Sequence, residues 1–225
     1  MSSNVKKEKV IKKGAEASLY YGHWFGKEVI FKYRIPKKYR IKELDKSIRT
    51  QRTLNEAKAL IKVKTYGINV PQVFEIDSVN STIVMKYIQG NRLKDILSEL
   101  DDDLKKKYFN DLGRIIAVLH RNGHIHGDIT TSNIIITPEN HIFLIDFGLH
   151  EYSNTIEDKS VDLHLLKRVL ISSHGFENYK FCFYAFLEGY RLEYEKMEDD
   201  ECDKIIKNIN SIESRGRYID SEDRL

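Results

Sequence analysis

Two short strings in this sequence carry the side chains best suited to chemistry: HGDITTSN at 126–133 and IDFG at 145–148. Asp128 and Asp146 supply carboxylates 18 positions apart, and Asn133 supplies an amide. Phosphoryl transfer needs such a set, because one carboxylate meets the proton of the acceptor oxygen while amide and carboxylate oxygens hold magnesium. The two strings together predict a kinase-type nucleotide site, with Asp128 as catalytic base and Asn133 and Asp146 as magnesium ligands.

A lysine and a glutamate upstream could position the phosphates. Lys32 lies in the apolar stretch EVIFKYR, where a lysine needs a partner because an unpaired buried ammonium is costly. Glu56, in a helical pattern 24 positions later, is the natural candidate. Taken singly, they could be an exposed lysine and an unrelated helical glutamate. The downstream strings favour the Lys–Glu pair that positions phosphates in kinases.

Three departures from an ordinary protein kinase are visible. The loop KKGAEASLYYG has one glycine before its strand instead of G-x-G-x-x-G, and Glu16 places an acidic group where phosphates would lie. Gly127 replaces the arginine of H-R-D, which argues against regulation by a phosphorylated activation loop. Nine residues separate Gly148 from Asp158 and no A-P-E string occurs, so no conventional platform for a peptide substrate is expected.

Composition restricts the class of protein. The 225 residues are 41% hydrophobic and 32% charged with 3 prolines, which is typical of a globular chain. The sequence has no apolar run of about 20 residues and no signal-like start, so an intracellular protein without a membrane span is expected. Two cysteines are too few for a disulfide framework.

For His124 and His126, structural hydrogen bonds are favoured over metal ligation, because no Cys/His cluster accompanies them.

Charge is distributed unevenly along the chain. Residues 1–52 contain 15 Lys/Arg and 5 Asp/Glu, a balance of +10, whereas residues 151–225 contain 11 and 17, a balance of −6. A solvated basic surface and a contact with nucleic-acid phosphates both fit the first segment, and composition leaves the two open.

Periodicity predicts an α+β, bilobal chain. A strand-rich N-lobe over 1–88 and a helical C-lobe over 89–225 are expected. The expected strands are 9–13, 17–24, 27–33, 72–77 and 81–87, and the expected helices are 47–66, 101–122, 158–172, 178–194 and 199–210.

With these motifs in place, the chain closely resembles the small kinase/ATPase subunit of the KEOPS (EKC) complex, a PRPK-type atypical kinase. The matching strings run in family order over nearly the whole chain. They are GAEA (14–17), VIFKYRIPKKYR (29–40), RTLNEAKAL (52–60), HGDITTSN (126–133), IDFGLH (145–150), EDKSVDLHLLKR (157–168) and RGR (215–217).

The resemblance implies a protein-kinase-like fold that binds ATP with Mg²⁺, hydrolyses ATP, phosphorylates itself and has Ser/Thr kinase activity. This activity would support threonylcarbamoylation of adenosine 37 in tRNAs that read codons beginning with adenine. The threonylcarbamoyl-transferase subunit would dock on the C-lobe and another small subunit on the N-lobe. The protein would be cytoplasmic, and also nuclear in eukaryotes.

The resemblance also carries roles onto individual positions. It implies ATP binding by Gly14, Ala15, Glu16, Lys32 and Glu56, catalysis by Asp128, magnesium ligation by Asn133 and Asp146, and tRNA contact by Arg215 and Arg217.

Other readings stay open at this level. An aminoglycoside-type phosphotransferase also uses an H-G-D loop, but needs an acceptor pocket for which the 77 residues after Gly148 leave little chain. A RIO-type kinase would lack the GAEA and RGR strings. A pseudokinase scaffold would not need the intact set of Lys32, Asp128, Asn133 and Asp146.

Overall fold

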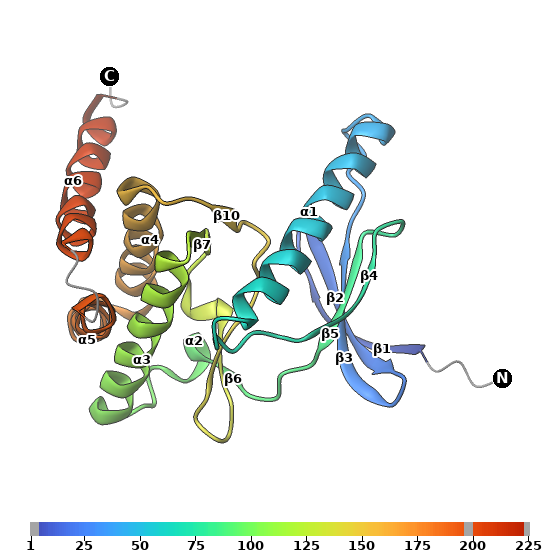
Figure 1. Cartoon of the computed structure of the whole chain (residues 1–225), viewed down its shortest axis with the longest axis horizontal. Helices are drawn as coiled ribbons and strands as arrows, with labels where there is room; N and C mark the ends of the chain where they lie inside the picture. Colours follow the sequence, from blue (N-terminus) through green and yellow to red (C-terminus); the bar gives the residue numbers. More distant parts are fainter. Residues whose placement is uncertain (1–4, 196–199, 223–225) are drawn as a thin grey trace. The chain divides into compact units, whose positions relative to one another are not determined.

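The structure, a computed structural model, describes residues 5–195 and 200–222, with side chains described except at 176, 177 and 215–222. The chain forms two compact units (Figure 1). The first unit comprises the chain up to Gln89 together with Phe143–Gly148, and the second comprises Gly90–Ile142 and the chain from Leu149 onward. Among the described residues, no helix is both long and apolar enough to cross a bilayer.

The first unit is an antiparallel sheet with one long helix. Its strand order is β1-β2-β3-β5-β4, and helix α1 packs against β4 and β5 (Figure 1). The bounds are β1 Val5–Lys13, β2 Ala17–Trp24, β3 Lys27–Arg34, α1 Lys42–Lys64, β4 Val73–Asp77 and β5 Thr82–Lys86. All five predicted strands are present. An apolar cluster of Val29, Phe31 and Val84 fills part of the interior, as the alternation along β3 requires.

Helix α1 begins earlier than the apolar periodicity indicated. The pattern predicted a start near residue 47, but the helix begins at Lys42. Its first turn contains Glu43 and Asp45, and negative charge is favoured there by the helix dipole. Asp45 also accepts from Arg49 Nε at 2.7 Å, an (i, i+4) pair that supports the turn. The basic connector thus ends several residues sooner than periodicity alone suggests.

The second unit is mainly helical. Its longer helices are α3 Asp102–Arg121, α4 Ile156–His174, α5 Phe176–Tyr194 and α6 Glu201–Glu222. Its short elements are β6 Asn91–Arg92, α2 Leu93–Ile96, β7 His124–Ile125, a 3₁₀ turn Thr131–Asn133, β8 Ile134–Ile136 and β10 Glu151–Tyr152. Strand β9, Ile142–Leu144, starts here and its last two residues belong to the first unit.

Helix packing in the second unit depends on close backbone approach and on ion pairs. A Cβ at Gly113 of α3 would lie 2.0 Å from the carbonyl oxygen of Phe186 of α5, so only glycine permits this approach. Lys159 of α4, which is almost fully buried, donates to Glu201 of α6 at 2.8 Å. A strand-rich unit followed by a helix-rich unit confirms the expected α+β class. The proposed domains 1–88 and 89–225 stay a prediction.

Candidate active site

Strand β3 and helix α1 bring the predicted phosphate-positioning pair together. Side chains two apart on a strand share a face, so Lys32 and Arg34 both point to one side of β3. Lys32 Nζ donates to Glu56 Oε1 at 2.5 Å, and Arg34 Nη2 donates to Glu56 Oε2 at 2.6 Å. Lys32 Nζ also donates to Asp146 Oδ1 at 2.7 Å. The pairing of Lys32 with Glu56 is therefore present, and Asp146 joins it.

This cluster keeps Lys32 charged. Its side chain is 7% exposed and that of Glu56 is 1% exposed, so both charges lie largely out of water. Burial disfavours the ammonium, but the carboxylates of Glu56 and Asp146 outweigh it and raise the pKa of Lys32 above its ordinary value. With Arg34, two cations face two anions, which is the balance that buried charges require.

The turn after β9 orients the Asp146 carboxylate. Asp146 has φ +66°, a left-handed conformation that few residues other than glycine adopt. Its Oδ1 accepts from the backbone N–H of Gly148 at 3.3 Å. A Cβ at Gly148 would lie 3.0 Å from that same oxygen. The IDFG string therefore forms a tight turn that directs a carboxylate to Lys32.

The GAEA loop is held to α1 by its own acidic residue. Gly14 N–H donates to the Ala17 carbonyl at 2.9 Å, which closes the loop. The Glu16 carboxylate accepts from Arg52 Nη1 at 2.6 Å and lies 3.8 Å from Lys37 Nζ. Lys37 Nζ also donates to the Ala15 carbonyl. The acidic group that the sequence placed near the phosphates is thus paired with two cations.

In the second unit, the HGDITTSN string brings the catalytic candidate into contact with one of the two predicted magnesium ligands. Asn133 Nδ2 donates to Asp128 Oδ2 at 2.7 Å and to the Asp128 carbonyl at 3.0 Å. Asn133 ends the 3₁₀ turn that follows Asp128. Since the amide nitrogen is used for Asp128, the amide oxygen is the atom that could bind a metal.

A carboxylate that sequence reasoning missed fixes this loop. Asp162 of α4 is 2% exposed and accepts from the backbone N–H of His126 at 2.9 Å and of Gly127 at 3.0 Å. Its Oδ2 also lies 3.1 Å from His120 Nε2. A buried carboxylate with such partners sets the backbone on which Asp128 stands. The sequence does contain one sign of this role: Asp162 is an acidic residue among apolar positions of the predicted helix 158–172.

The backbone explains why glycine replaces the arginine of H-R-D. Gly127 has φ +78°, and a Cβ there would lie 2.3 Å from the carbonyl oxygen of Leu149. Both the dihedral angle and the contact exclude a larger side chain without rearrangement. Gly127 is therefore required by the local fold of the loop.

The histidines beside the loop form structural contacts. His124 Nδ1 and His150 Nε2 lie 2.8 Å apart, and both rings contact the ring of Tyr152 on β10. Burial, followed by the charges that His124 and His126 can carry, lowers the pKa of His150 to about 4. No group of three or more His, Cys, Asp or Glu that could hold a metal occurs among the described residues.

The His150 pKa makes stability depend on pH. An unfolded histidine takes up its proton near pH 6.5, whereas folded His150 does so only near pH 4. The free energy of unfolding should therefore fall as pH drops from about 6.5 towards 4. Relative to wild type, His150→Asn should lose about 1–2 kcal/mol less over this range, a figure discounted for solvent screening. Urea denaturation at pH 7 and pH 4.5 measures this loss of unfolding free energy. The variant His141→Asn, which removes an exposed histidine, is the control and should lose as much as wild type. If His150→Asn also lost as much as wild type, His150 would not be the source of the pH dependence.

The predicted site residues fall in two groups, one in each unit. Lys32, Glu56 and Asp146 are in contact in the first unit, and Asp128 and Asn133 are in contact in the second. The donor set fits magnesium, which prefers carboxylate and amide oxygens and usually keeps waters and substrate phosphates as its other ligands. The side chains of the predicted tRNA-contacting residues, Arg215 and Arg217, lie outside the described residues.

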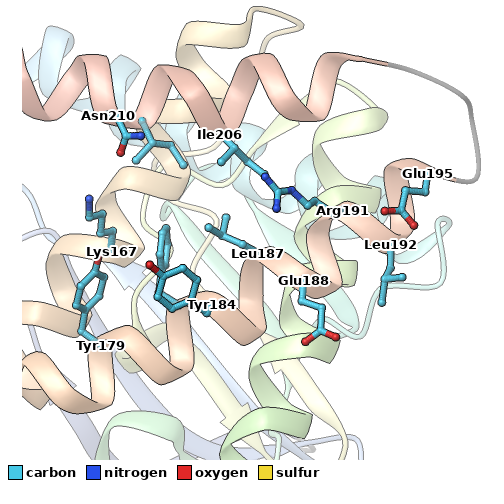
Figure 2. A pocket seen from close by; sticks show the side chains of 12 residues that line it. Lys167, Tyr179, Tyr184, Leu187, Glu188, Arg191, Leu192, Glu195, Ile206 and Asn210 are labelled. Carbon is cyan, nitrogen blue, oxygen red and sulfur yellow. The ribbon is translucent and has the colours of Figure 1, made fainter.

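A groove of about 410 Å³ lies in the second unit apart from these side chains (Figure 2). Helices α4, α5 and α6 form it. Lys167 and Arg191 bring positive charge to it, and Glu188 and Glu195 bring negative charge. None of the predicted site residues lines it.

Comparison with known proteins gives consistent matches. The model of the protein kinase domain family matches residues 6–169. The KEOPS complex subunit Bud32 of Pyrococcus abyssi is 44% identical over 216 residues, which cover 93% of this chain and 96% of that protein. Probable bifunctional tRNA threonylcarbamoyladenosine biosynthesis proteins of Methanosphaera stadtmanae and Methanobrevibacter smithii are 40% and 43% identical over 94% of this chain. The chain spans 37% of the length of each of these two.

Proposed function

This chain belongs to the protein kinase domain family, within the family of the KEOPS complex subunit Bud32, and we propose that it is an atypical Ser/Thr protein kinase and ATPase. Its ATP cycle would support threonylcarbamoylation of adenosine 37 in tRNAs that read codons beginning with adenine. The kinase-domain match supports ATP-dependent chemistry in general. The names of the relatives support the role in tRNA modification.

The observation that carries the enzymatic proposal is the buried cluster around Lys32. A lysine with a raised pKa, held between Glu56 and Asp146, is a permanent cation on a β-strand, which suits it to bind phosphate oxygens. A scaffold that never binds nucleotide would gain little from this arrangement, because buried ion pairs seldom add net stability.

The chain's own residues would divide the chemistry as follows. Lys32 orients the α- and β-phosphates, with Glu56 holding the ammonium in place. Asp128 accepts the proton of the attacking hydroxyl or water as the oxygen bonds to the γ-phosphorus and the bond to ADP breaks. Asn133 and Asp146 would hold magnesium, which when bound neutralises charge on the phosphate oxygens. Gly14, Ala15 and Glu16 would border the nucleotide.

Calorimetry with ATP and magnesium tests the proposal. Lys32→Met should weaken ATP binding about 10–100-fold, since a hydrogen bond from a charged group contributes about 1.5–3 kcal/mol. Lys58→Met, which removes an exposed lysine from α1, is the matched control and should bind like wild type. Binding by wild type that Lys32→Met leaves unchanged would remove Lys32 from the site. Absence of magnesium-dependent binding by wild type would favour the scaffold reading.

The assembly is part of the proposal. The chain would join the KEOPS complex, with the threonylcarbamoyl-transferase subunit on the C-lobe and a small subunit on the N-lobe. Arg215 and Arg217, together with the basic segment 1–52, would contact tRNA phosphates. The name of the Pyrococcus relative supports membership of the complex. We also propose an intracellular, cytoplasmic location, and a nuclear one as well if the source is eukaryotic.

A further inference from the structure

Arg34 is a second buried cation beside the phosphate-positioning lysine, and the chemistry above assigns it no role. It lies two positions after Lys32 on β3, and 4% of its side chain is exposed. Its Nη2 donates to Glu56 Oε2 at 2.6 Å and to the Arg52 carbonyl at 3.4 Å. Each carboxylate oxygen of Glu56 is therefore held by a different cation of the same strand.

Stability alone is a poor explanation for this guanidinium. Arg34 Nε is buried and has no hydrogen-bond partner among the described residues. A buried donor left unpaired destabilises the folded state, because it has given up its hydrogen bonds to water. Apolar side chains of similar volume often replace buried ion pairs with no loss of stability. The cost suggests that the position serves something other than folding.

Nucleotide binding would require Lys32 to change its hydrogen-bond partners, and Arg34 could hold Glu56 in place during that change. In the structure Lys32 Nζ divides its hydrogen bonds between Glu56 and Asp146. If Lys32 binds nucleotide phosphates and Asp146 binds magnesium, the 2.7 Å pair between them must separate. Glu56 would then follow Lys32 unless another group held it.

The geometry of Arg34 suits it to hold Glu56 during that exchange. Its two hydrogen bonds reach the side chain of Glu56 and the backbone of Arg52, one turn apart on α1. A Cβ at Gly148 would lie 3.5 Å from Arg34 Nη2, so the guanidinium also borders the turn that carries Asp146. Strand, helix and turn thus meet at this one side chain.

We propose that Arg34 is a positioning residue that keeps Glu56 and α1 fixed on β3 while Lys32 transfers its hydrogen bonds from Asp146 to the phosphates of the nucleotide. This inference rests on the proposed ATP-dependent function. It assigns Arg34 no contact with substrate. Its action passes through Glu56, so the two residues should behave as a unit in mutation.

A double-mutant cycle on ATP turnover tests that coupling. Arg34→Met should lower kcat about tenfold or more with less than a threefold change in KM, because ground-state binding of ATP is largely kept. Arg34→Lys should recover part of the loss, since it restores a cation opposite Glu56. In a Glu56→Gln background, Arg34→Met should have no further effect. Arg121→Met is the control, because Arg121 is an ion-paired arginine of α3 whose partner, Glu193, lies outside the candidate site.

Three results would overturn the proposal: an unchanged kcat in Arg34→Met, additivity of Arg34→Met and Glu56→Gln, and an Arg34→Lys variant that is folded yet recovers nothing. Thermal melting of each variant separates loss of fold from loss of positioning.

A measurement without turnover keeps the two proposals distinguishable. If wild type hydrolyses no ATP, the proposed function fails by itself. Hydrogen exchange of the α1 amides around Glu56, followed by mass spectrometry, then decides on Arg34. Arg34→Met should speed this exchange severalfold, because Glu56 and the Arg52 backbone lose the guanidinium that holds them to β3, and Arg121→Met should leave the exchange unchanged. Unchanged exchange at these amides in Arg34→Met would show that Arg34 does not hold α1 on β3.

Discussion

Replacing Asp128 with asparagine is expected to lower kcat for ATP turnover by about 10²–10⁴-fold, the range that positioned proton acceptors contribute. Asparagine keeps the shape of the side chain, and its oxygen can still accept from Asn133 Nδ2, which lies 2.7 Å from Asp128 Oδ2. The lost property is proton acceptance by a carboxylate. ATP affinity should therefore change little, because the phosphates are proposed to be held by other residues.

Steady-state turnover and calorimetry on the same preparation measure the two effects separately. Asp103→Asn, which removes an exposed carboxylate from the first turn of α3, is the matched control and should turn over ATP like wild type. If Asp128→Asn retained turnover within about twofold of wild type, Asp128 could not be the proton acceptor.

Substituting Gly127 with alanine is expected to damage both the loop and catalysis. The free energy of unfolding should fall by about 2 kcal/mol or more, because an added Cβ combines strain at φ +78° with a contact of 2.3 Å to the Leu149 carbonyl. Movement of Gly127 would shift Asp128 next to it, so turnover should also fall more than tenfold. Denaturant unfolding and turnover are the measurements.

Gly175→Ala separates the two causes. Gly175 has the same φ of +78°, but a Cβ there would meet nothing within 4 Å. Because φ +78° with ψ 162° is a region that essentially only glycine adopts, this variant should show only a conformational cost of about 1–3 kcal/mol, with turnover unchanged. If Gly127→Ala cost no more than Gly175→Ala and left turnover intact, the close approach to Leu149 would not govern the loop. Gly127→Arg, which restores the H-R-D string, should be at least as damaging as Gly127→Ala.

Local patterns in the sequence predicted the strands of the first unit, the long helices and the contact between Lys32 and Glu56, but not all helix bounds: α1 begins at Lys42 instead of 47, and α6 ends at Glu222 instead of 210. Strand alternation places Lys32 on an interior face of its strand, and helix periodicity places Glu56 on the interior face of its helix. A buried lysine needs a carboxylate partner. The same alternation puts Arg34 on the face of Lys32, so the sequence also contains the signal for the second cation. The kinase-like fold follows from the two strings and is confirmed by the family match.

Other features depend on contacts that no local pattern records. Asp162 binds the backbone of His126 and Gly127 from 36 and 35 positions away, and nothing in its helix indicates those partners. The need for glycine at 127 comes from the position of the Leu149 backbone. Ion pairing of Glu16 with Arg52 likewise joins residues 36 positions apart. Such contacts are set by tertiary packing.

The central claim is that the chain turns over ATP with a kinase-type site, and phosphate release from ATP by the purified wild-type chain tests it most directly. The account predicts release that requires magnesium, disappears in Asp128→Asn and persists in the Asp103→Asn control. Equal release by wild type and Asp128→Asn, or none from folded wild type alone and with its transferase partner and tRNA, would contradict it.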